Sequence, residues 1–206
     1  MPASPGFRAD PGPAFSAAHR GGTGPPLVAI HGIADTWRTW ELVLPALERF
    51  HDVLAVTLPG HAGGPLIDRP VDSALLADGV EWAMDEAGIA DAHLVGNSLG
   101  GFVALTLAAR GRARSVVALA PAGGWTPGDP AFVDMLRMQQ RLIRSTVAGA
   151  PFADEIVASR EGARRATELI TVRFEHIPRS LIAHQIRGVA ACAGGEALIE
   201  CAIESG

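Results

Sequence analysis

The sequence predicts an α/β fold in which a mostly parallel sheet carries helices on both faces. Between residues 27 and 120, apolar runs of strand length alternate with segments whose apolar residues recur at helical spacing. Such alternation requires crossover connections, and therefore a parallel sheet covered by helices. After residue 126 only helical spacing remains, which predicts a helical region following the sheet. With 206 residues, 48% of them hydrophobic, the chain suits one domain, or one domain with an inserted helical region.

Four apolar runs are the predicted core strands, because each is nearly continuous, as in strands buried on both faces. They cover residues 27–30, 53–58, 92–95 and 114–120. A first short strand is expected within 14–20, before the glycine- and proline-rich turn of residues 21–26. Helices are predicted where apolar residues repeat every three or four positions, over 36–49, 72–87 and 102–108.

The chain divides into three predicted segments. Residues 1–13 are rich in proline and glycine and are expected to be a mobile lead-in. Residues 14–125 contain the strand–helix alternation and form the predicted core. Residues 126–206 form the predicted helical region, with helices at 129–148, 151–159, 163–177, 179–192 and 196–204.

Composition excludes several classes of chemistry. The net charge of −5 offers no basic surface for nucleic acid. All 17 basic residues are arginine, so no Schiff-base lysine and no lysine of a phosphate-binding loop is present. Cys192 and Cys201 lie outside any metal-ligand spacing and are expected to be buried thiols. No cofactor motif, membrane span or signal peptide is recognisable, so a cytoplasmic protein that binds no membrane is expected.

The pattern Gly96-Asn97-Ser98-Leu99-Gly100 is the centre of the sequence. An apolar run enters it and a helical pattern leaves it, which predicts a sharp turn between a strand and a helix at the serine. Such a turn strains the serine backbone and lifts the hydroxyl above the edge of the sheet. Gly96 and Gly100 lack side chains, so the strand and the helix can approach closely. The pattern favours a nucleophilic serine over a plain strand–helix turn.

A second glycine turn, His31-Gly32-Ile33, follows the first core strand. Gly32 lets the backbone turn at the carboxyl end of that strand, the edge where open α/β sheets bind their ligands. An amide exposed there can face Ser98 and stabilise a developing oxyanion. An ordinary strand–helix loop is the alternative. His31 is expected to be structural, its ring fixing the loop, and not to carry protons.

Three motifs follow one another along the chain: His31-Gly32-Ile33, Leu58-Pro59-Gly60-His61 and Gly96-Asn97-Ser98-Leu99-Gly100-Gly101. In this order and spacing, residues from about 14 to 125 resemble the α/β-hydrolase fold superfamily. The resemblance implies that Ser98 is the nucleophile and that the amides of Ile33 and Leu99 form the oxyanion hole. The turn is similar to those of serine esterases and of hydrolases that cleave carbon–carbon bonds in meta-cleavage products. Members with an aspartate nucleophile, the dehalogenases and epoxide hydrolases, are disfavoured because this position is Ser98.

The same resemblance identifies residues 126–206 as a cap, a helical insertion that covers the active site and shapes substrate choice. Four apolar residues of this segment can line an acyl or ring pocket, although the interior of the cap is the commoner place for such residues: Met135, Met138, Phe152 and Phe174. Three arginines recur on one side of a cap helix, more often a solvated face than a carboxylate clamp: Arg137, Arg141 and Arg144.

After the cap, the family pattern calls for further strands that carry a triad acid and then a histidine. The sequence ends at Gly206 without such a segment, so the C-terminal strands and the usual base for Ser98 are expected to be missing. His31 or His61 can substitute, since both lie in loops at the catalytic edge, but such motif histidines are more often structural. The strand at 115–119 is expected at an uncovered edge, which favours self-association.

Two hypotheses remain. In the first, the chain derives from a serine hydrolase that acts on an ester, or a related acyl or carbon–carbon bond, of a small molecule. It is then incomplete, or another segment completes its site. In the second, the chain is a non-catalytic binding protein that keeps a capped pocket. Neither hypothesis requires a metal or a cofactor. Reaction of Ser98 with a fluorophosphonate distinguishes the two.

Overall fold

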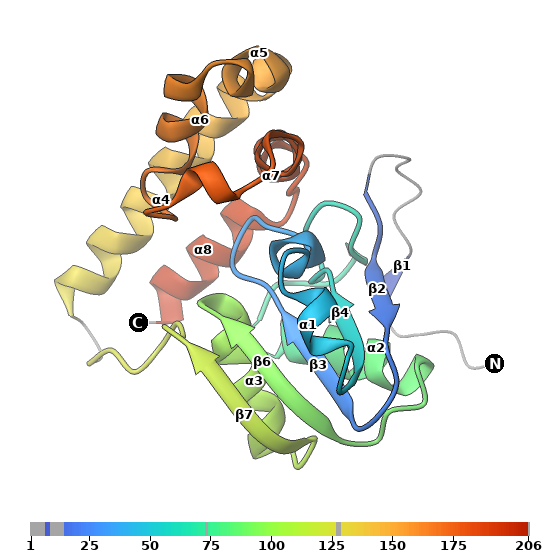
Figure 1. Ribbon diagram of the computed structural model, residues 1–206. Helices are drawn as coiled ribbons and strands as arrows, with labels where there is room; N and C mark the ends of the chain where they lie inside the picture. Colours follow the sequence, from blue (N-terminus) through green and yellow to red (C-terminus); the bar gives the residue numbers. More distant parts are fainter. Residues whose placement is uncertain (1–6, 9–14, 73, 127–128, 206) are drawn as a thin grey trace.

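A computed structural model describes Phe7–Arg8 and residues 15–72, 74–126 and 129–205 (Figure 1). Its main sheet has five strands in the order β2-β4-β3-β6-β7. β2 runs antiparallel to β4, and all other neighbours are parallel. The predicted mostly parallel sheet is therefore confirmed. The strands are β2 (Ala18–Gly21), β3 (Pro26–Ile30), β4 (Asp52–Val56), β6 (Ala92–Asn97) and β7 (Ala113–Leu119).

Strand β3 lies at the centre of the sheet, between β4 and β6. Its last residue, Ile30, pairs with Val56 of β4 on one side and with Gly96 of β6 on the other. The three carboxyl ends therefore lie level with one another. Because each sequence motif follows one of these strands directly, all three motifs gather at the same edge of the sheet (Figure 1).

Helices cover both faces of the sheet, because successive side chains of a strand point to opposite sides. Val28 and Leu94 pack on one face with residues of α2 and α3. Ala29, next to Val28 in the chain, packs on the other face with Trp40 and Leu44. The helices of these two layers are η1 (Trp37–Trp40), α1 (Leu44–Leu47), α2 (Leu75–Glu86) and α3 (Leu99–Ala109).

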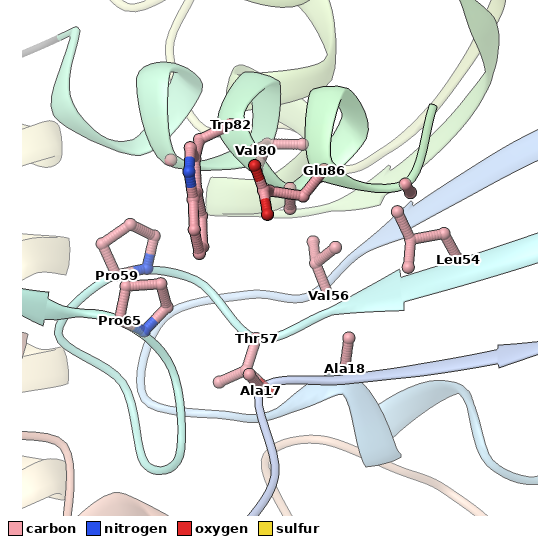
Figure 2. Close-up of a pocket in the computed structure, with 13 residues that line it drawn as sticks. Ala17, Ala18, Leu54, Val56, Thr57, Pro59, Pro65, Val80, Trp82 and Glu86 are labelled. Atoms are coloured by element: carbon pink, nitrogen blue, oxygen red, sulfur yellow. The ribbon is translucent and has the colours of Figure 1, made fainter. Parts of the chain in front are cut away.

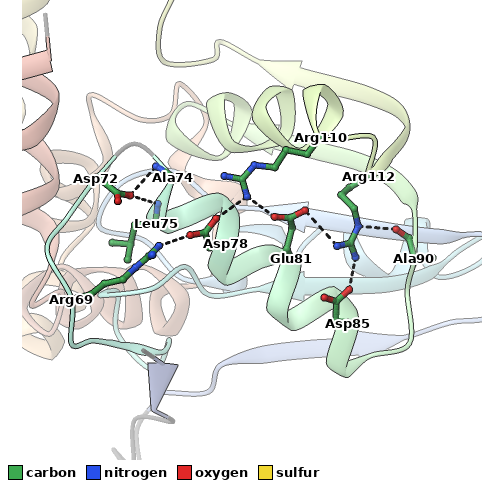
Figure 3. A network of polar contacts seen from close by, with 10 residues as sticks. All are labelled: Arg69, Asp72, Ala74, Leu75, Asp78, Glu81, Asp85, Ala90, Arg110 and Arg112. Carbon is green, nitrogen blue, oxygen red and sulfur yellow. Dashed lines mark hydrogen bonds and ion pairs between the residues drawn. The ribbon is translucent and has the colours of Figure 1, made fainter. Parts of the chain in front are cut away.

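The outer surface of α2 is joined to its neighbours by arginine–carboxylate pairs (Figure 3). Asp78 pairs with Arg69 and Arg110, and Glu81 pairs with Arg110 and Arg112. Partial burial acts to raise the pKa of Asp78, but the hydrogen bonds from Arg110 and Arg69 outweigh it and hold this pKa below its ordinary value. Because Arg110 directly follows α3, the network links α2 to α3.

Helix α3 begins in close contact with the end of β3. A Cβ atom added at Gly100 would lie 2.2 Å from the carbonyl oxygen of Ile30 and 2.5 Å from that of His31. Both neighbours are backbone atoms, which cannot rotate away as a side chain can. The absence of a side chain at Gly100 is thus what allows α3 to start directly above the sheet edge.

After β7 the chain forms a stack of helices, called here the helical layer, above the carboxyl ends of the strands (Figure 1). It has a core of its own, which includes Ala153, Val157, Ile182 and Ile186. None of the described helices is long and apolar enough to cross a lipid bilayer. The layer comprises α4 (Pro130–Gly149), η2 (Ala150–Phe152), α5 (Ala153–Ala158), α6 (Arg160–Thr167), η3 (Phe174–His176), α7 (Arg179–Ala190) and α8 (Gly195–Ser205).

Two of the predicted helices are wrong in extent. The segment 36–49 forms the two short helices η1 and α1, because Pro45 lies in the first turn of α1 and has no N–H to bond to the turn before it. The segment 163–177 is also interrupted, since α6 ends at Thr167 and η3 begins only at Phe174. The β-branched run 170–172 lies between them, and such side chains lose rotamer freedom in a helix.

The N-terminal part differs from expectation in one respect. Phe7–Arg8 forms a strand, β1, that pairs antiparallel with β5 (Leu66–Ile67). These two residues belong to the segment 1–13 predicted as a mobile lead-in, whose remaining residues lie outside the described ones. Strand β5 is too short to leave a periodic pattern and was not predicted. The strand expected within 14–20 occurs as β2, displaced toward the turn that follows it.

Strand β7 is an edge of the described sheet, as predicted for residues 115–119. Val117 is 53% exposed and Leu119 is 45% exposed. Both belong to a continuous apolar run of the kind that parallel sheets normally bury on both faces. This edge consequently combines exposed apolar side chains with strand backbone that faces no neighbour in the described part of the chain.

The contact between α3 and β3 predicts the effect of two glycine substitutions. Gly100→Ala should lower the free energy of unfolding by about 3 kcal/mol, because backbone atoms must move to admit the methyl group. Gly188→Ala is the matched control. Gly188 is also buried in a helix, but its added Cβ would meet Thr36 Cγ2 at an ordinary 3.6 Å. Urea unfolding should show Gly188→Ala unchanged or up to about 1 kcal/mol more stable. Equal effects would contradict the role given to Gly100.

Candidate active site

Ser98 lies at the junction of β6 and α3 with backbone angles of φ 51° and ψ −116°. A positive φ is uncommon for a residue with a side chain. Holding such a residue in a sparsely populated region costs on the order of 1–3 kcal/mol and persists only where the surroundings enforce it. The backbone is therefore strained at the serine of the Gly96-Asn97-Ser98-Leu99-Gly100 pattern.

Main-chain hydrogen bonds from the end of β7 and from the segment after it hold this conformation. The N–H of Ser98 donates to the carbonyl of Leu119 at 2.9 Å, and the N–H of Ala122 donates to the carbonyl of Ser98 at 2.9 Å. Gly101 and Phe102, in the first turn of α3, donate to the same carbonyl. Sequence analysis missed Leu119 and Ala122, because they act through their backbone and their side chains give no signal.

The hydroxyl of Ser98 is not used to build the fold. A serine in front of a helix commonly accepts a hydrogen bond from the first helical N–H groups. The Ser98 side chain makes no such bond to α3, and no hydrogen bond to this hydroxyl occurs among the described residues. The residue is partly exposed. Its oxygen is thus available to a bound molecule.

The loop after β3 passes directly beside this turn. A Cβ added at Gly32 would lie 3.4 Å from the Cβ of Ser98 and 3.3 Å from Oδ1 of Asn97. Ile33, the next residue, therefore belongs to the same edge as Ser98. Leu99 is the first residue of α3, so its N–H has no acceptor within the helix. The dipole of α3 also favours negative charge at this end.

Gly96 makes the turn itself possible. A Cβ at this position would lie 2.1 Å from the carbonyl oxygen of Gly100. The end of β6 and the start of α3 are therefore in direct backbone contact on the two sides of Ser98. Both glycines of the motif, Gly96 and Gly100, therefore lie where a side chain would collide with backbone atoms.

His31 is fully buried, and both of its ring nitrogens are engaged. Nε2 accepts from the N–H of Leu58 at 2.9 Å, so Nδ1 carries the proton and donates to the carbonyl of Gly32 at 2.6 Å. Burial, together with the nearby ring of His61, lowers the pKa of His31 well below its ordinary value. His31 therefore links the ends of β3 and β4 as a neutral ring and has no nitrogen left to accept a proton.

His61 packs against His31, with the ring centroids 4.9 Å apart. Its Nδ1 lies 3.0 Å from the carbonyl of Pro59, and its buried Nε2 has no partner among the described residues. Burial lowers the pKa of His61 to about 4. No hydrogen bond joins Ser98 to a histidine in the described part of the chain, so neither His31 nor His61 is placed as its base.

Two apolar residues considered for a pocket are on the surface of the helical layer. Met138 is 45% exposed and Phe152 is 59% exposed, so neither belongs to the interior of this layer. Phe174 packs at the edge of its core, with the Arg160 guanidinium 5.2 Å from the ring centroid. Three arginines on one side of α4 are exposed: Arg137, Arg141 and Arg144. The last of them, Arg144, pairs with Glu196 at 2.9 Å.

The cysteines are not the fully buried thiols that the sequence suggested, since Cys192 and Cys201 are both partly exposed. Burial nevertheless raises the pKa of Cys192 to about 11, against the opposing effect of the backbone of Gly195, Gly194 and Ala34. The thiol thus keeps its proton at neutral pH, and Sγ donates to the carbonyl of Gly60 at 3.5 Å.

Asp35 is a further polar residue at this edge, which sequence analysis did not single out. Burial raises the pKa of its carboxyl group above the ordinary value, against hydrogen bonds from Thr36, Thr39 and Gln185. The sequence does contain a local signal for Asp35, because an aspartate followed by a threonine is typical of the start of a helix. Gln185 comes from α7, far away in the sequence, so that contact left no local pattern.

A cavity of about 270 Å³ lies apart from these residues, between β2, β4 and α2 (Figure 2). Its lining is mostly apolar, with Trp82 and Glu86 on the α2 side. None of the predicted site residues lines it. Among the described residues, no group of three or more His, Cys, Asp or Glu side chains is arranged to hold a metal ion.

The buried histidines predict a loss of stability in mild acid. His61 has a pKa of about 4 when folded and about 6.5 when unfolded, so the unfolded chain binds the proton first. The stability is complete above pH 6.5 and is lost as the pH falls toward 4. Between pH 7 and pH 5, His61 alone should cost about 2 kcal/mol, and His31 acts in the same direction.

Urea unfolding at pH 7 and pH 5 measures this loss. His61→Gln should reduce the difference between the two pH values by about 2 kcal/mol, because the residue that titrates is gone. His176→Gln, on the surface of the helical layer, is the control and should leave the difference unchanged. A pH dependence that is the same in both variants would show that His61 is not the cause.

Comparison with known proteins agrees with this geometry. The model of a family described as the alpha/beta hydrolase family matches residues 27–194. An epoxide hydrolase of Mycobacterium tuberculosis is 51% identical over 81 residues, which are 39% of this chain and 35% of that protein. A 2-hydroxymuconate semialdehyde hydrolase of Pseudomonas sp. strain CF600 is 34% identical over 139 residues, covering 58% of this chain and 48% of its own length.

A solved structure of a hydrolase from Pseudomonas aeruginosa PA01 shares the fold, with a TM-score of 0.56 at 22% identity over 91% of this chain and 72% of that one. The chain spans about a third to a half of the length of these two curated relatives. The family match covers the sheet from β3 onward and the helical layer as far as the turn before α8. By its fold and by this match, the chain belongs to the alpha/beta hydrolase family.

Proposed function

We propose that this chain carries the nucleophile and the oxyanion hole of a serine hydrolase. Its substrate is a small molecule with an ester, or a related acyl or carbon–carbon bond next to a carbonyl group. Ser98 is the nucleophile, and the amides of Ile33 and Leu99 are the oxyanion donors. The observation that carries the proposal is the strained backbone of Ser98 beside Gly32. Strain of this kind has no use in an ordinary strand–helix turn.

The proposed reaction begins when Oγ of Ser98 adds to the carbonyl carbon of the substrate. The carbonyl oxygen becomes negative, and the two amides and the N-terminus of α3 stabilise that charge. The bond to the leaving group then breaks, the leaving group takes up a proton, and the acyl group stays on Ser98. Water subsequently cleaves this acyl-enzyme and restores the hydroxyl.

The proton of Ser98 needs an acceptor, because a serine hydroxyl is a weak nucleophile at neutral pH. His31 is engaged at both nitrogens, and His61 is buried beside it. Because no described histidine is placed to accept the proton, we propose that water accepts it. Hydrolysis should then be several powers of ten slower than with a complete triad, since the oxyanion hole and binding alone contribute.

The helical layer is the proposed cap of this site, with residues 14–125 as the core and 126–206 as the cap. It stacks over the sheet edge that bears Ser98 (Figure 1). We also propose a cytoplasmic location, in line with Cys192 and Cys201, which are not joined by a disulfide.

The name of the Mycobacterium tuberculosis relative suggests epoxide opening as another activity. That reaction displaces an alkoxide from a saturated carbon and forms no carbonyl oxyanion. Two amides beside the nucleophile, together with a neutral hydroxyl in place of a carboxylate, suit addition to a carbonyl better. The Pseudomonas relative, named as a semialdehyde hydrolase, is in line with a carbonyl substrate.

The second candidate function is binding without catalysis. One observation favours it, namely that no described histidine is hydrogen-bonded to Ser98. In this case the strained turn would be a remnant, and the serine would not react even with a strongly activated reagent.

A fluorophosphonate probe separates the two candidates. Its phosphorus is attacked by Oγ of Ser98, the P–O bond forms, fluoride leaves and the proton passes to water. We expect slow covalent labelling at pH 8, detected as a mass increase on the peptide that contains Ser98. Ser98→Ala should abolish it completely, because the attacking oxygen is removed.

Ser115→Ala is the matched control, since Ser115 is an exposed serine on the neighbouring strand β7 and makes a hydrogen bond to His93. The Ser115→Ala variant should be labelled to the same extent as the unmodified chain. A chain that is correctly folded but never labelled would establish the binding hypothesis, and labelling that survives in Ser98→Ala would refute the assigned nucleophile.

We also propose that two copies of the chain associate through β7. Its exposed apolar residues and free strand edge are the features that promote strand pairing between molecules. Sedimentation velocity over a range of concentrations should show self-association that Val117→Glu removes, because two charges would oppose each other at the contact. Val172→Glu, at a 96% exposed valine of the helical layer, should leave it intact. A monomer at every concentration would refute this interface.

A further inference from the structure

The two ends of the sheet carry different contacts. At the carboxyl ends of the strands, the loops are joined to the helical layer, since the N–H of Gly194 donates to the carbonyl of Gly60 at 2.8 Å. At the amino ends, which face away from that layer (Figure 1), two histidine side chains meet. The rings of His51 and His93 have centroids 5.7 Å apart and planes inclined at 67°. This histidine pair lies at the opposite end of β6 from Ser98, so it is separate from the proposed active site.

The register of the sheet brings the two rings together. His51 directly precedes β4, and His93 is the second residue of β6. Strand β3 lies between these two strands, and its Leu27 pairs with Val53 on one side and with His93 on the other. The two side chains therefore reach each other across the start of β3, although they are far apart in the sequence.

Each ring is already fixed through one of its nitrogens. Nδ1 of His51 lies 3.3 Å from the carbonyl of Pro25, which can only accept, so Nδ1 carries the proton. Nδ1 of His93 lies 2.8 Å from Oγ of Ser115 on the neighbouring strand β7. A histidine that binds a metal commonly donates its other N–H to an oxygen acceptor such as a backbone carbonyl. His51 is held in this way, and the hydroxyl of Ser115 can accept from His93 in the same manner.

The other nitrogen of each ring is available to a ligand. Neither Nε2 has a hydrogen-bond partner among the residues that the structure describes. Both side chains are partly exposed. With Nδ1 protonated, Nε2 of a neutral imidazole carries a free electron pair, and histidine is the commonest metal ligand in proteins. An ion from solution can therefore reach two uncommitted imidazole nitrogens.

The spacing and inclination of the rings suit one shared ion. An ion lies in the plane of each imidazole that binds it, so rings stacked face to face cannot share it, whereas planes that cross at 67° can. Two imidazoles on a tetrahedral zinc ion, with Zn–N bonds of about 2.1 Å, have centroids about 5.2 Å apart. The observed 5.7 Å is slightly larger, and partly exposed side chains can close that difference by a small rotation.

We propose that His51 and His93 bind one zinc ion through their Nε2 atoms, with water in the remaining positions. Two imidazole ligands favour zinc and related transition ions over magnesium or calcium, which prefer oxygen. Because the rings come together only in the folded chain, the ion joins the turn before β4 to β6 and stabilises the fold. The inference does not depend on the function proposed for Ser98.

Calorimetric titration of the full chain with zinc chloride tests the proposal. It should show saturable binding of one ion at this pair. His51→Gln and His93→Gln should each weaken the binding at least tenfold, because a single imidazole remains. Ser115→Ala should weaken it about tenfold, because the acceptor that orients His93 is gone. Zinc should also raise the thermal unfolding midpoint of the unmodified chain, and the effect should be lost when both histidines are replaced.

Two control variants come from the other histidines. His176→Gln removes an exposed histidine of the helical layer and should leave the binding unchanged. His19→Gln removes a histidine that lies 2.5 Å from Glu48, another combination that can bind zinc, and should also leave it unchanged. Binding that is lost in His19→Gln but kept in His51→Gln and His93→Gln would overturn the proposal.

A spectroscopic measurement on the unmodified chain needs no substitution and decides the question even where a variant fails to fold. Among the seven histidines, zinc should shift the NMR ring resonances of His51 and His93. If the resonances of this pair do not respond to zinc, the proposal is wrong and the two rings make an aromatic contact only.

Discussion

Contact between main chains at one edge of the sheet is the constraint on which the rest of the site depends. Helix α3 starts against the end of β3, and β6 runs into α3, with no room for a Cβ at Gly96 or Gly100. These contacts bring the loop after β3 beside the turn that bears Ser98. Because Gly96 and Gly100 carry no side chain, the backbone at this edge can come close to a bound molecule and offer it N–H groups.

The electrostatics of this edge follow from the same close packing. His31 and His61 are buried and stay neutral, so they join the loops without adding a positive charge. The dipole of α3 then remains as a source of positive potential near Ser98. The end of β7 and the segment after it fix the serine backbone, and α7 contacts the loop after β3 through the hydrogen bond between His184 and Thr36.

Local patterns made the sheet and the turn at Ser98 predictable. The strand–helix alternation and the glycines around Ser98 are each encoded within a few residues, and the structure has them nearly in place. Features set by distant contacts could not be foreseen. His184 meets Thr36, and Ala122 meets Ser98, through contacts that no periodicity records. Pro45 is the local signal in the sequence for the break between η1 and α1.

The contact between Gly60 and Gly194 has a consequence for how this architecture can vary. The chain leaves the sheet at Ala122, hydrogen-bonded to Ser98, and comes back to it at Gly194, hydrogen-bonded to the loop after β4. Because hydrogen bonds fix the chain at both points, insertions or deletions in the helices between Ala122 and α7 need not disturb the site around Ser98. Natural diversity should accumulate in α4, α5 and α6, while the length of the tether from α7 to Gly194 stays constant.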